Sequence, residues 1–143
     1  MSNTLTLKTA RLPAPAQPLA CRLHRRELIG RHGVVPYTAE IELENLSNTP
    51  LEIEHRMTGL QYLNLVVCDS RGKKVSQGHF GDRFAPAAEK AVLRLVPGEK
   101  FTASVHLFAT MPDGPIPPGT YVVQAIYEYN GIEAVSEPVE VTV

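Results

Sequence analysis

The sequence predicts an all-β protein, folded as an antiparallel β-sandwich of about seven to nine strands. Residues 101–107 and 121–129 alternate between apolar and other residues, and a Pro-Gly pair lies shortly before each run. Alternation with a period of two, bounded by turn residues, is typical of half-buried antiparallel strands. The chain of 143 residues also contains 12 prolines and 10 glycines, which suits a fold with frequent turns.

The first part of the chain is expected to supply two strands and a proline-rich connection. Residues 4–8 alternate briefly and predict a short first strand. Residues 12–18 contain three prolines, so we expect an extended connector or edge piece, because proline cannot donate to a sheet ladder. Alternation resumes over residues 19–29, and Gly30 to Gly33 predict a turn.

The central part of the chain contains the strands expected at the middle of the fold. In residues 37–46, positions 40, 42 and 44 are glutamates and the odd positions from 39 to 43 are apolar. One face of this strand is therefore expected in the core and the other in solvent. After a polar turn, residues 51–54 alternate again. Residues 62–68 are almost continuously apolar, which is the pattern of a strand covered on both faces.

Turn residues divide the remaining sequence into further strands. Residues 69–72 (Asp-Ser-Arg-Gly) and the pair Asn130-Gly131 each predict a hairpin. Residues 92–95 are expected to form a short strand before the two long runs, and residues 138–143 are expected to close the sheet. No segment predicts a helix of three turns, so nothing in the pattern argues for a helix-covered sheet.

Length and charge limit the class of protein. The length fits one domain over residues 1–143, of which residues 1–18 are partly an extended N-terminal segment. The 14 Lys and Arg nearly balance the 15 Asp and Glu, which argues against nucleic acid or a membrane as a partner. No apolar stretch approaches about 18 residues, so a cytoplasmic location is expected. A bacterial lipoprotein is the alternative, because Leu19-Ala20-Cys21 resembles the end of such a signal.

The cysteines and histidines do not form a recognisable reactive site. Cys21 and Cys68 are expected to be buried, reduced thiols, and the alternative is an inter-sheet disulfide of the immunoglobulin type. The histidines have no zinc-ligand spacing, and the chain has no G-x-S-x-G motif. We therefore expect no enzymatic activity, no cofactor, no metal site and no catalytic residues. The five histidines are His24, His32, His55, His79 and His106.

Tyr121 narrows the expected fold class. It stands just inside a late strand and follows a glycine-containing turn, as does the tyrosine corner of immunoglobulin-like sandwiches, whose hydroxyl bonds back to the upstream backbone. An ordinary half-buried strand tyrosine is the alternative. The sequence thus favours an immunoglobulin-like antiparallel β-sandwich.

The order of the turn motifs resembles the bacterial intracellular proteinase inhibitor family. The motifs are residues 44–51, residues 59–69, Gly72-Lys73-Lys74-Val75, Pro97-Gly98-Glu99 and Pro118-Gly119-Thr120-Tyr121. The resemblance covers residues 41 to 129 and implies an immunoglobulin-like sandwich in a bacterial cytoplasm, with inhibition of serine proteases as its activity. The family usually carries a tryptophan after the central hairpin, and residues 75–80 of this chain contain none.

Residue types common at protein interfaces gather in two loops. Residues 76–90 contain aromatic and arginine side chains, which are enriched at interface hot spots. Residues 111–118 contain four prolines, and a stiff loop loses little entropy on docking. Alternatively, the aromatic residues cover the end of the core and the second loop is a plain connection. The candidate binding residues are Phe80, Arg83, Phe84, Met111, Asp113 and Ile116.

These observations predict a non-enzymatic protein-interaction module that binds a protein partner, of unknown identity, through loops or a sheet edge. One alternative is an intracellular serine protease inhibitor that presents residues 78–86 or 111–118 to an active-site cleft. A second is a structural subunit whose sheet edges pair into a homo-oligomer. A carbohydrate-binding sandwich is disfavoured, because the chain has no Trp and only 5 Tyr and 4 Phe.

Overall fold

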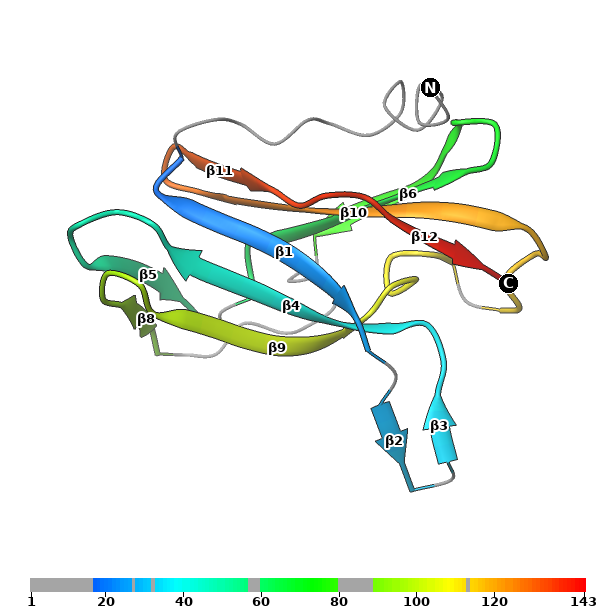
Figure 1. Ribbon diagram of the computed structural model, residues 1–143, viewed down its shortest axis with the longest axis horizontal. Helices are drawn as coiled ribbons and strands as arrows, with labels where there is room; N and C mark the ends of the chain where they lie inside the picture. Colours follow the sequence, from blue (N-terminus) through cyan, green and yellow to red (C-terminus); the bar gives the residue numbers. More distant parts are fainter. Residues whose placement is uncertain (1–16, 27, 32, 57–59, 80–88, 113) are drawn as a thin grey trace.

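The computed structural model describes residues 17–26, 28–31, 33–56, 60–79, 89–112 and 114–143. It confirms the all-β class, because the described residues form antiparallel strands packed as a sandwich and contain no α-helix (Figure 1). The strands in chain order are β1 (Leu19–Arg25), β2 (Leu28–Gly30), β3 (Gly33–Val35), β4 (Thr38–Asn45), β5 (Leu51–His55), β6 (Leu63–Asp69), β7 (Lys74–His79), β8 (Ala91–Leu95), β9 (Lys100–His106), β10 (Thr120–Tyr129), β11 (Ile132–Val135) and β12 (Val139–Thr142).

Two sheets enclose the core. β4 lies between β1 and β9 in a three-stranded sheet, and the five-stranded sheet has the order β11-β10-β6-β7, with β12 also paired to β10. The pairs β2–β3 and β5–β8 form two short ribbons. Side chains from both sheets fill the space between them, among them Ile41, Leu43, Leu65, Val123 and Tyr127. β1 and β11 are edge strands of different sheets and lie side by side (Figure 1).

The predicted faces of the central strands are confirmed. In β4, Ile41 and Leu43 are fully buried, whereas the three glutamates between and beside them are only half-buried. In β6, Leu65 points into the core, and Asn64 and Cys68 on the opposite face are also buried. β6 is therefore covered on both faces, as its continuous apolar run predicts.

Both predicted hairpins are confirmed. The Oδ1 atom of Asp69 accepts hydrogen bonds from the backbone N–H groups of Arg71 and Lys73, each at 2.9 Å, and these bonds close the turn between β6 and β7. Asn130 and Gly131 have φ angles of 49° and 85°. A two-residue turn of type I′ requires positive φ at both positions, which is why Asn-Gly joins β10 to β11.

The boundaries of two other predicted segments were wrong. Residues 19–29 were expected as one strand, but β1 ends at Arg25 and β2 pairs separately with β3. Residues 76–90 were expected to be irregular, but β7 continues to His79 because its backbone pairs with β6, whatever the polarity of its side chains. The first strand predicted at residues 4–8 lies outside the described residues.

The two local predictions about Cys21 and Tyr121 have clear outcomes. Cys21 and Cys68 are buried and form no disulfide, as expected of reduced thiols.

The hydroxyl of Tyr121 donates a hydrogen bond to the carbonyl oxygen of Pro117 at 2.6 Å. This return to the upstream backbone is the interaction of a tyrosine corner, and it fastens the loop before β10 to the start of that strand.

Candidate functional site

Of the six loop residues predicted to bind a partner, the structure describes two, Met111 and Ile116. Phe80, Arg83, Phe84 and Asp113 lie outside the described residues. The side chains of Met111 and Ile116 are half-buried and pack against the core. In the described part of the loop, Pro112, Gly114 and Pro115 are exposed instead. The two candidates that the structure describes, Met111 and Ile116, therefore contribute to packing.

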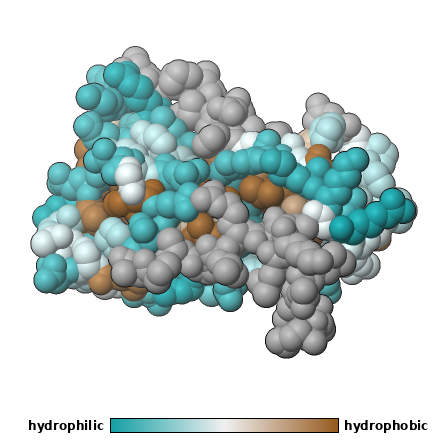
Figure 2. Space-filling view, turned by 90° about the horizontal axis from the view of Figure 1, so that it is seen from above, coloured by the Kyte–Doolittle hydropathy of each residue, from teal (hydrophilic) through white to brown (hydrophobic). Residues whose placement is uncertain are grey.

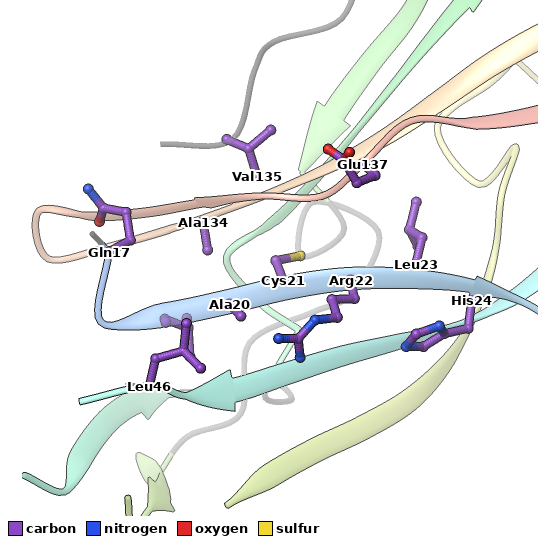
Figure 3. A pocket seen from close by; sticks show the side chains of 11 residues that line it. Gln17, Ala20, Cys21, Arg22, Leu23, His24, Leu46, Ala134, Val135 and Glu137 are labelled. Carbon is purple, nitrogen blue, oxygen red and sulfur yellow. The ribbon is translucent and has the colours of Figure 1, made fainter. Parts of the chain in front are cut away.

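A groove lies between β1 and β11 (Figure 3). Its volume is 490 Å³, within the range of small binding sites in proteins. Most of its walls are apolar, and polar side chains lie at its rim. The lining residues are Gln17, Leu19, Ala20, Cys21, Arg22, Leu23, His24, Leu46, Ala134, Val135 and Glu137.

Successive side chains of β1 point in opposite directions from the strand. In Figure 3, Cys21 and Leu23 point from β1 towards β11, whereas Arg22 and His24 point towards β4. Ala134 points from β11 towards β1. Small and apolar side chains therefore face each other between the sheets, which leaves open space where larger side chains would close the edge of the sandwich.

The hydrogen-bonding edge of β1 faces this groove. Asn45 donates its backbone N–H to Glu99 on the β9 side, and Leu46 donates its N–H to the carbonyl of Pro18 at 2.7 Å on the β1 side. Backbone N–H and C=O groups alternate in direction from one residue to the next along an antiparallel strand. Since the register pairs Ala20 with Glu44 of β4, the N–H and C=O groups of the residues on either side of Ala20 point away from β4. The residues so directed are Leu19, Cys21 and Leu23. No strand that the structure describes pairs with this side of β1.

Two side chain–backbone hydrogen bonds fasten the ends of the groove. At one end, the backbone N–H of Glu133 in β11 donates to the Oε1 atom of Gln17 at 3.2 Å. At the other end, Nη1 of Arg25 donates to the carbonyl oxygen of Glu140 in β12 at 3.3 Å. These bonds hold the two sheet edges at a fixed separation, so the groove between them is preformed.

The charged side chains beside the groove neutralise one another. Nη1 of Arg22 lies 2.5 Å from Glu42 and 2.7 Å from Glu44. Burial acts to raise the pKa of Glu42, but the hydrogen bond from Arg22 and the nearby positive charges of Lys100, Arg22 and His24 outweigh it, so that the pKa is lowered. The hydrogen bonds to Glu44 and Glu42 raise the pKa of Arg22. The groove is therefore edged by paired charges and has no strong net charge on this strand.

Cys21 does not supply a nucleophile to the groove. Burial raises the pKa of its thiol to about 12, and the charge of Arg22 lowers it only in part. A cysteine reacts as the thiolate, so at neutral pH this side chain is a small apolar group in the wall. Chemically, the groove can bind apolar groups and pair with an extended backbone.

Leu46 extends the apolar surface at the mouth of the groove. It follows β4 directly and exposes 56% of its surface, although it lines the groove beside Ala20 (Figure 3). Val92, on β8 and outside the groove, exposes 54%. Seen from above, apolar residues reach the surface in separate patches between hydrophilic ones (Figure 2). Single exposed apolar side chains are ordinary, so the position of Leu46 matters more than its exposure.

No metal centre is found within the described ranges, where no three His, Cys, Asp or Glu side chains are placed to hold an ion. His24 lies 3.4 Å from Glu42, and Nδ1 of His106 accepts the backbone N–H of Phe108 at 3.2 Å. His32 lies outside the described residues. His24 and His106 lie on β1 and β9, which β4 separates in the three-stranded sheet.

Comparison with known proteins gives the chain no family. It matches no protein-family model, and no curated protein sequence matches it. The part of the chain that the structure describes contains no helix long and apolar enough to cross a membrane.

Proposed function

We propose that the protein is a non-enzymatic protein-interaction module that takes an extended segment of a partner protein along the groove between β1 and β11. One observation carries the proposal: the backbone edge of β1 at Leu19, Cys21 and Leu23 opens onto an apolar groove. An added strand would pair with this edge, and its alternate side chains would enter the groove, which is the usual mode of β-strand addition.

Two features support a peptide rather than a small apolar ligand. The edge offers hydrogen-bonding groups at every second residue, and only an extended backbone matches that spacing. Each such bond contributes a net ~1 kcal/mol. The groove is also held open by the bonds of Gln17 and Arg25, so little conformational entropy is lost on binding.

A second copy of the chain is the alternative occupant. Arg22 is at the centre of β1 (Leu19–Arg25). If two β1 strands paired antiparallel about a twofold axis at their centres, Arg22 would lie opposite its own copy, although each arginine is already held by Glu42 and Glu44 of its own chain. Assembly of the protein with itself, as in a structural subunit, is an outcome of the test and is not the proposal.

Site-directed photo-crosslinking tests the contact. A photoreactive side chain at Ala20, which lines the groove, is expected to crosslink to one segment of a partner protein in a cell extract. The same group at Thr102, exposed on β9 of the same sheet, is the control and is expected to give no such product. A synthetic peptide of the crosslinked segment should then bind the purified protein.

Leu46 and Val92 form a matched pair of variants for this binding. Both are exposed to a similar extent, but only Leu46 borders the groove. Leu46→Asp is expected to weaken peptide binding about tenfold or more, because it removes apolar contact worth ~1.5 kcal/mol or more and places a charge at the mouth. Val92→Asp should leave the affinity unchanged. Equal effects of the two substitutions, or a crosslink at Thr102 equal to that at Ala20, would refute the proposal.

Serine protease inhibition is a second candidate, and the anchoring of residues 111–118 supports it. The backbone N–H of Met111 donates to Phe108 at 3.0 Å, and Pro117 accepts the hydroxyl of Tyr121. A loop fixed at both ends can enter a cleft at little entropic cost. An assay against trypsin-, chymotrypsin- and subtilisin-type proteases tests it: inhibition abolished by Pro115→Asp supports this candidate, and no inhibition of any of the three excludes it for these classes.

A further inference from the structure

The groove between β1 and β11 has charged side chains on both rims, and the two rims differ in how these charges are paired. On β1, Arg22 is paired with Glu42 and Glu44. His24 lies 3.4 Å from Glu42. On the opposite rim, Glu137 follows β11, lines the groove and is exposed. No cation among the described residues forms an ion pair with Glu137.

We propose that the extended segment bound along this groove carries a lysine or an arginine at its centre, with apolar residues two positions before and after it. Glu137 selects this basic residue and is the specificity-determining residue of the site. This rests on the proposed function, because it names the partner sequence that the same groove takes. The β1 edge and Leu46 then supply affinity whatever the charge of the segment, and Glu137 supplies the choice between segments.

The bonds at the two ends of the groove place Glu137 beside its middle. Gln17 is joined to Glu133 at one end, and Arg25 is joined to Glu140 at the other. The chain from β11 to β12 therefore runs beside β1 in the same direction. Glu137 lies about midway between Glu133 and Glu140 in the sequence, so it stands beside the central part of β1.

The register of an added strand brings one side chain to this position. In Figure 3, Glu137 lies across the groove from Cys21 and Leu23, both of which point from β1 towards β11. If the segment pairs antiparallel with β1, its residue opposite Cys21 points to the same side of the sheet as Cys21, because directly opposite residues share a face. The residues two positions away then lie opposite Leu19 and Leu23, which are apolar. The central residue is thus the one directed towards the rim of Glu137.

A long basic side chain fits both parts of this position. Cys21 and Ala134 are buried and line the groove, so they offer apolar surface to a methylene stem. Glu137 is exposed at the rim, where a charged head group remains in contact with water. Lysine and arginine bury their stems in this way and keep their charge at the surface. An acidic residue at the same place would face Glu137 with like charge.

Three synthetic peptides test this selection. In each, valine and threonine alternate, and the central residue on the valine side is lysine, methionine or glutamate. Fluorescence anisotropy of the labelled peptides with the full chain measures their affinities. We expect the lysine peptide to bind about fivefold more tightly than the methionine peptide, which is the effect of one partly exposed ion pair. The glutamate peptide should bind more weakly than both.

Glu137 and Glu128 provide matched variants. Both are exposed carboxylates at the five-stranded sheet, Glu128 in β10, and only Glu137 lines the groove. Glu137→Gln is expected to remove the differences among the three peptides, and Glu137→Lys is expected to reverse their order. Glu128→Lys should leave the order as it is. An unchanged far-UV circular dichroism spectrum of each variant separates a changed preference from a changed fold.

The outcomes separate failure of this selection from failure of the groove itself. Equal affinities of the three peptides for the unchanged protein, or equal effects of Glu137→Lys and Glu128→Lys, would overturn the role of Glu137. If Leu46→Asp still weakens the binding of all three peptides, the proposed function stands without it. A segment crosslinked at Ala20 that contains no lysine or arginine would also overturn the selection. Binding of none of the peptides would overturn both proposals.

Discussion

Removal of the Asn45 side chain is expected to destabilise the protein more than any other single change in the turn between β4 and β5. Asn45 is 1% exposed. Its Nδ2 atom donates to the carbonyl oxygens of Thr49 and Leu95 at 2.8 and 2.9 Å. Its Oδ1 atom accepts the backbone N–H of Ser47 at 2.9 Å and the Ser47 hydroxyl at 2.7 Å. The side chain therefore joins the turn to β8 and sets the position of Leu46, the next residue along.

The magnitude follows from these contacts. Four hydrogen bonds at a net ~1 kcal/mol each set an upper value of about 4 kcal/mol for Asn45→Ala. Thr49 is exposed and Ser47 half-exposed, so water can replace part of what they lose, whereas the bond to Leu95 is buried. We therefore expect a loss of about 3 kcal/mol, or a fall in melting temperature of roughly 10 °C for a domain of this size.

Urea denaturation followed by far-UV circular dichroism measures this loss. Asn48→Ala is the control, since Asn48 is an exposed residue of the same turn and surface substitutions usually change stability by less than about 0.5 kcal/mol. A loss below about 1 kcal/mol for Asn45→Ala, or equal effects of the two substitutions, would refute the assignment of the turn's stability to this side chain.

Three further predictions concern single groups. Tyr121→Phe should cost about 1 kcal/mol in the free energy of unfolding, measured in urea, because it removes the bond to Pro117; no loss would show that the tyrosine corner does not stabilise the loop. The folded state lowers the pKa of Glu42 from its ordinary value of 4.5, so Glu42 stabilises the fold above pH 4.5, and this contribution is lost as the pH falls through the lowered pKa. The urea midpoint should therefore fall less with acid pH in Glu42→Gln than in the unchanged protein, and parallel curves for the two proteins would contradict this. Burial raises the pKa of Cys21 from 9.0 to about 12, so the thiol should resist iodoacetamide at pH 8 until urea unfolds the chain, as mass spectrometry would show; rapid labelling of the native protein would count against it.

Much of the fold could be predicted because the information was local. The glutamates of β4 alternate with buried residues, and Asn130-Gly131 can form the tight turn that the structure contains. The error at β7 arose because a strand can be held by its ladder to β6 alone. Side-chain periodicity, the signal used to find strands, carries no information about such a segment.

The candidate site was less predictable because it depends on which edge strands of the two sheets lie next to each other. Sequence patterns can indicate edge strands near both ends of the chain, but not that Cys21 would face Ala134, which lies more than a hundred positions further along. Conversely, Met111 and Ile116 were expected on a binding loop, and the structure turns both towards the core. The direction of an apolar side chain in a proline-rich loop is decided by how the loop docks, and no local pattern encodes that.

The edge of β1, and not the edge of β7, is proposed to bind a partner because the two edge strands differ in how they are protected from pairing. Exposed edges invite unwanted pairing, and proteins protect them with bulges and with lysines. The β7 edge has both, a register shift at Val67/Cys68 and Lys74. In β1 the charge of Arg22 is turned onto Glu42 and Glu44, so it neutralises the sheet surface, and no strand within the described ranges pairs with the outer edge of β1. A fold that protects the β7 edge and holds a groove open beside the β1 edge is consistent with selection for a partner that binds β1 as an added strand.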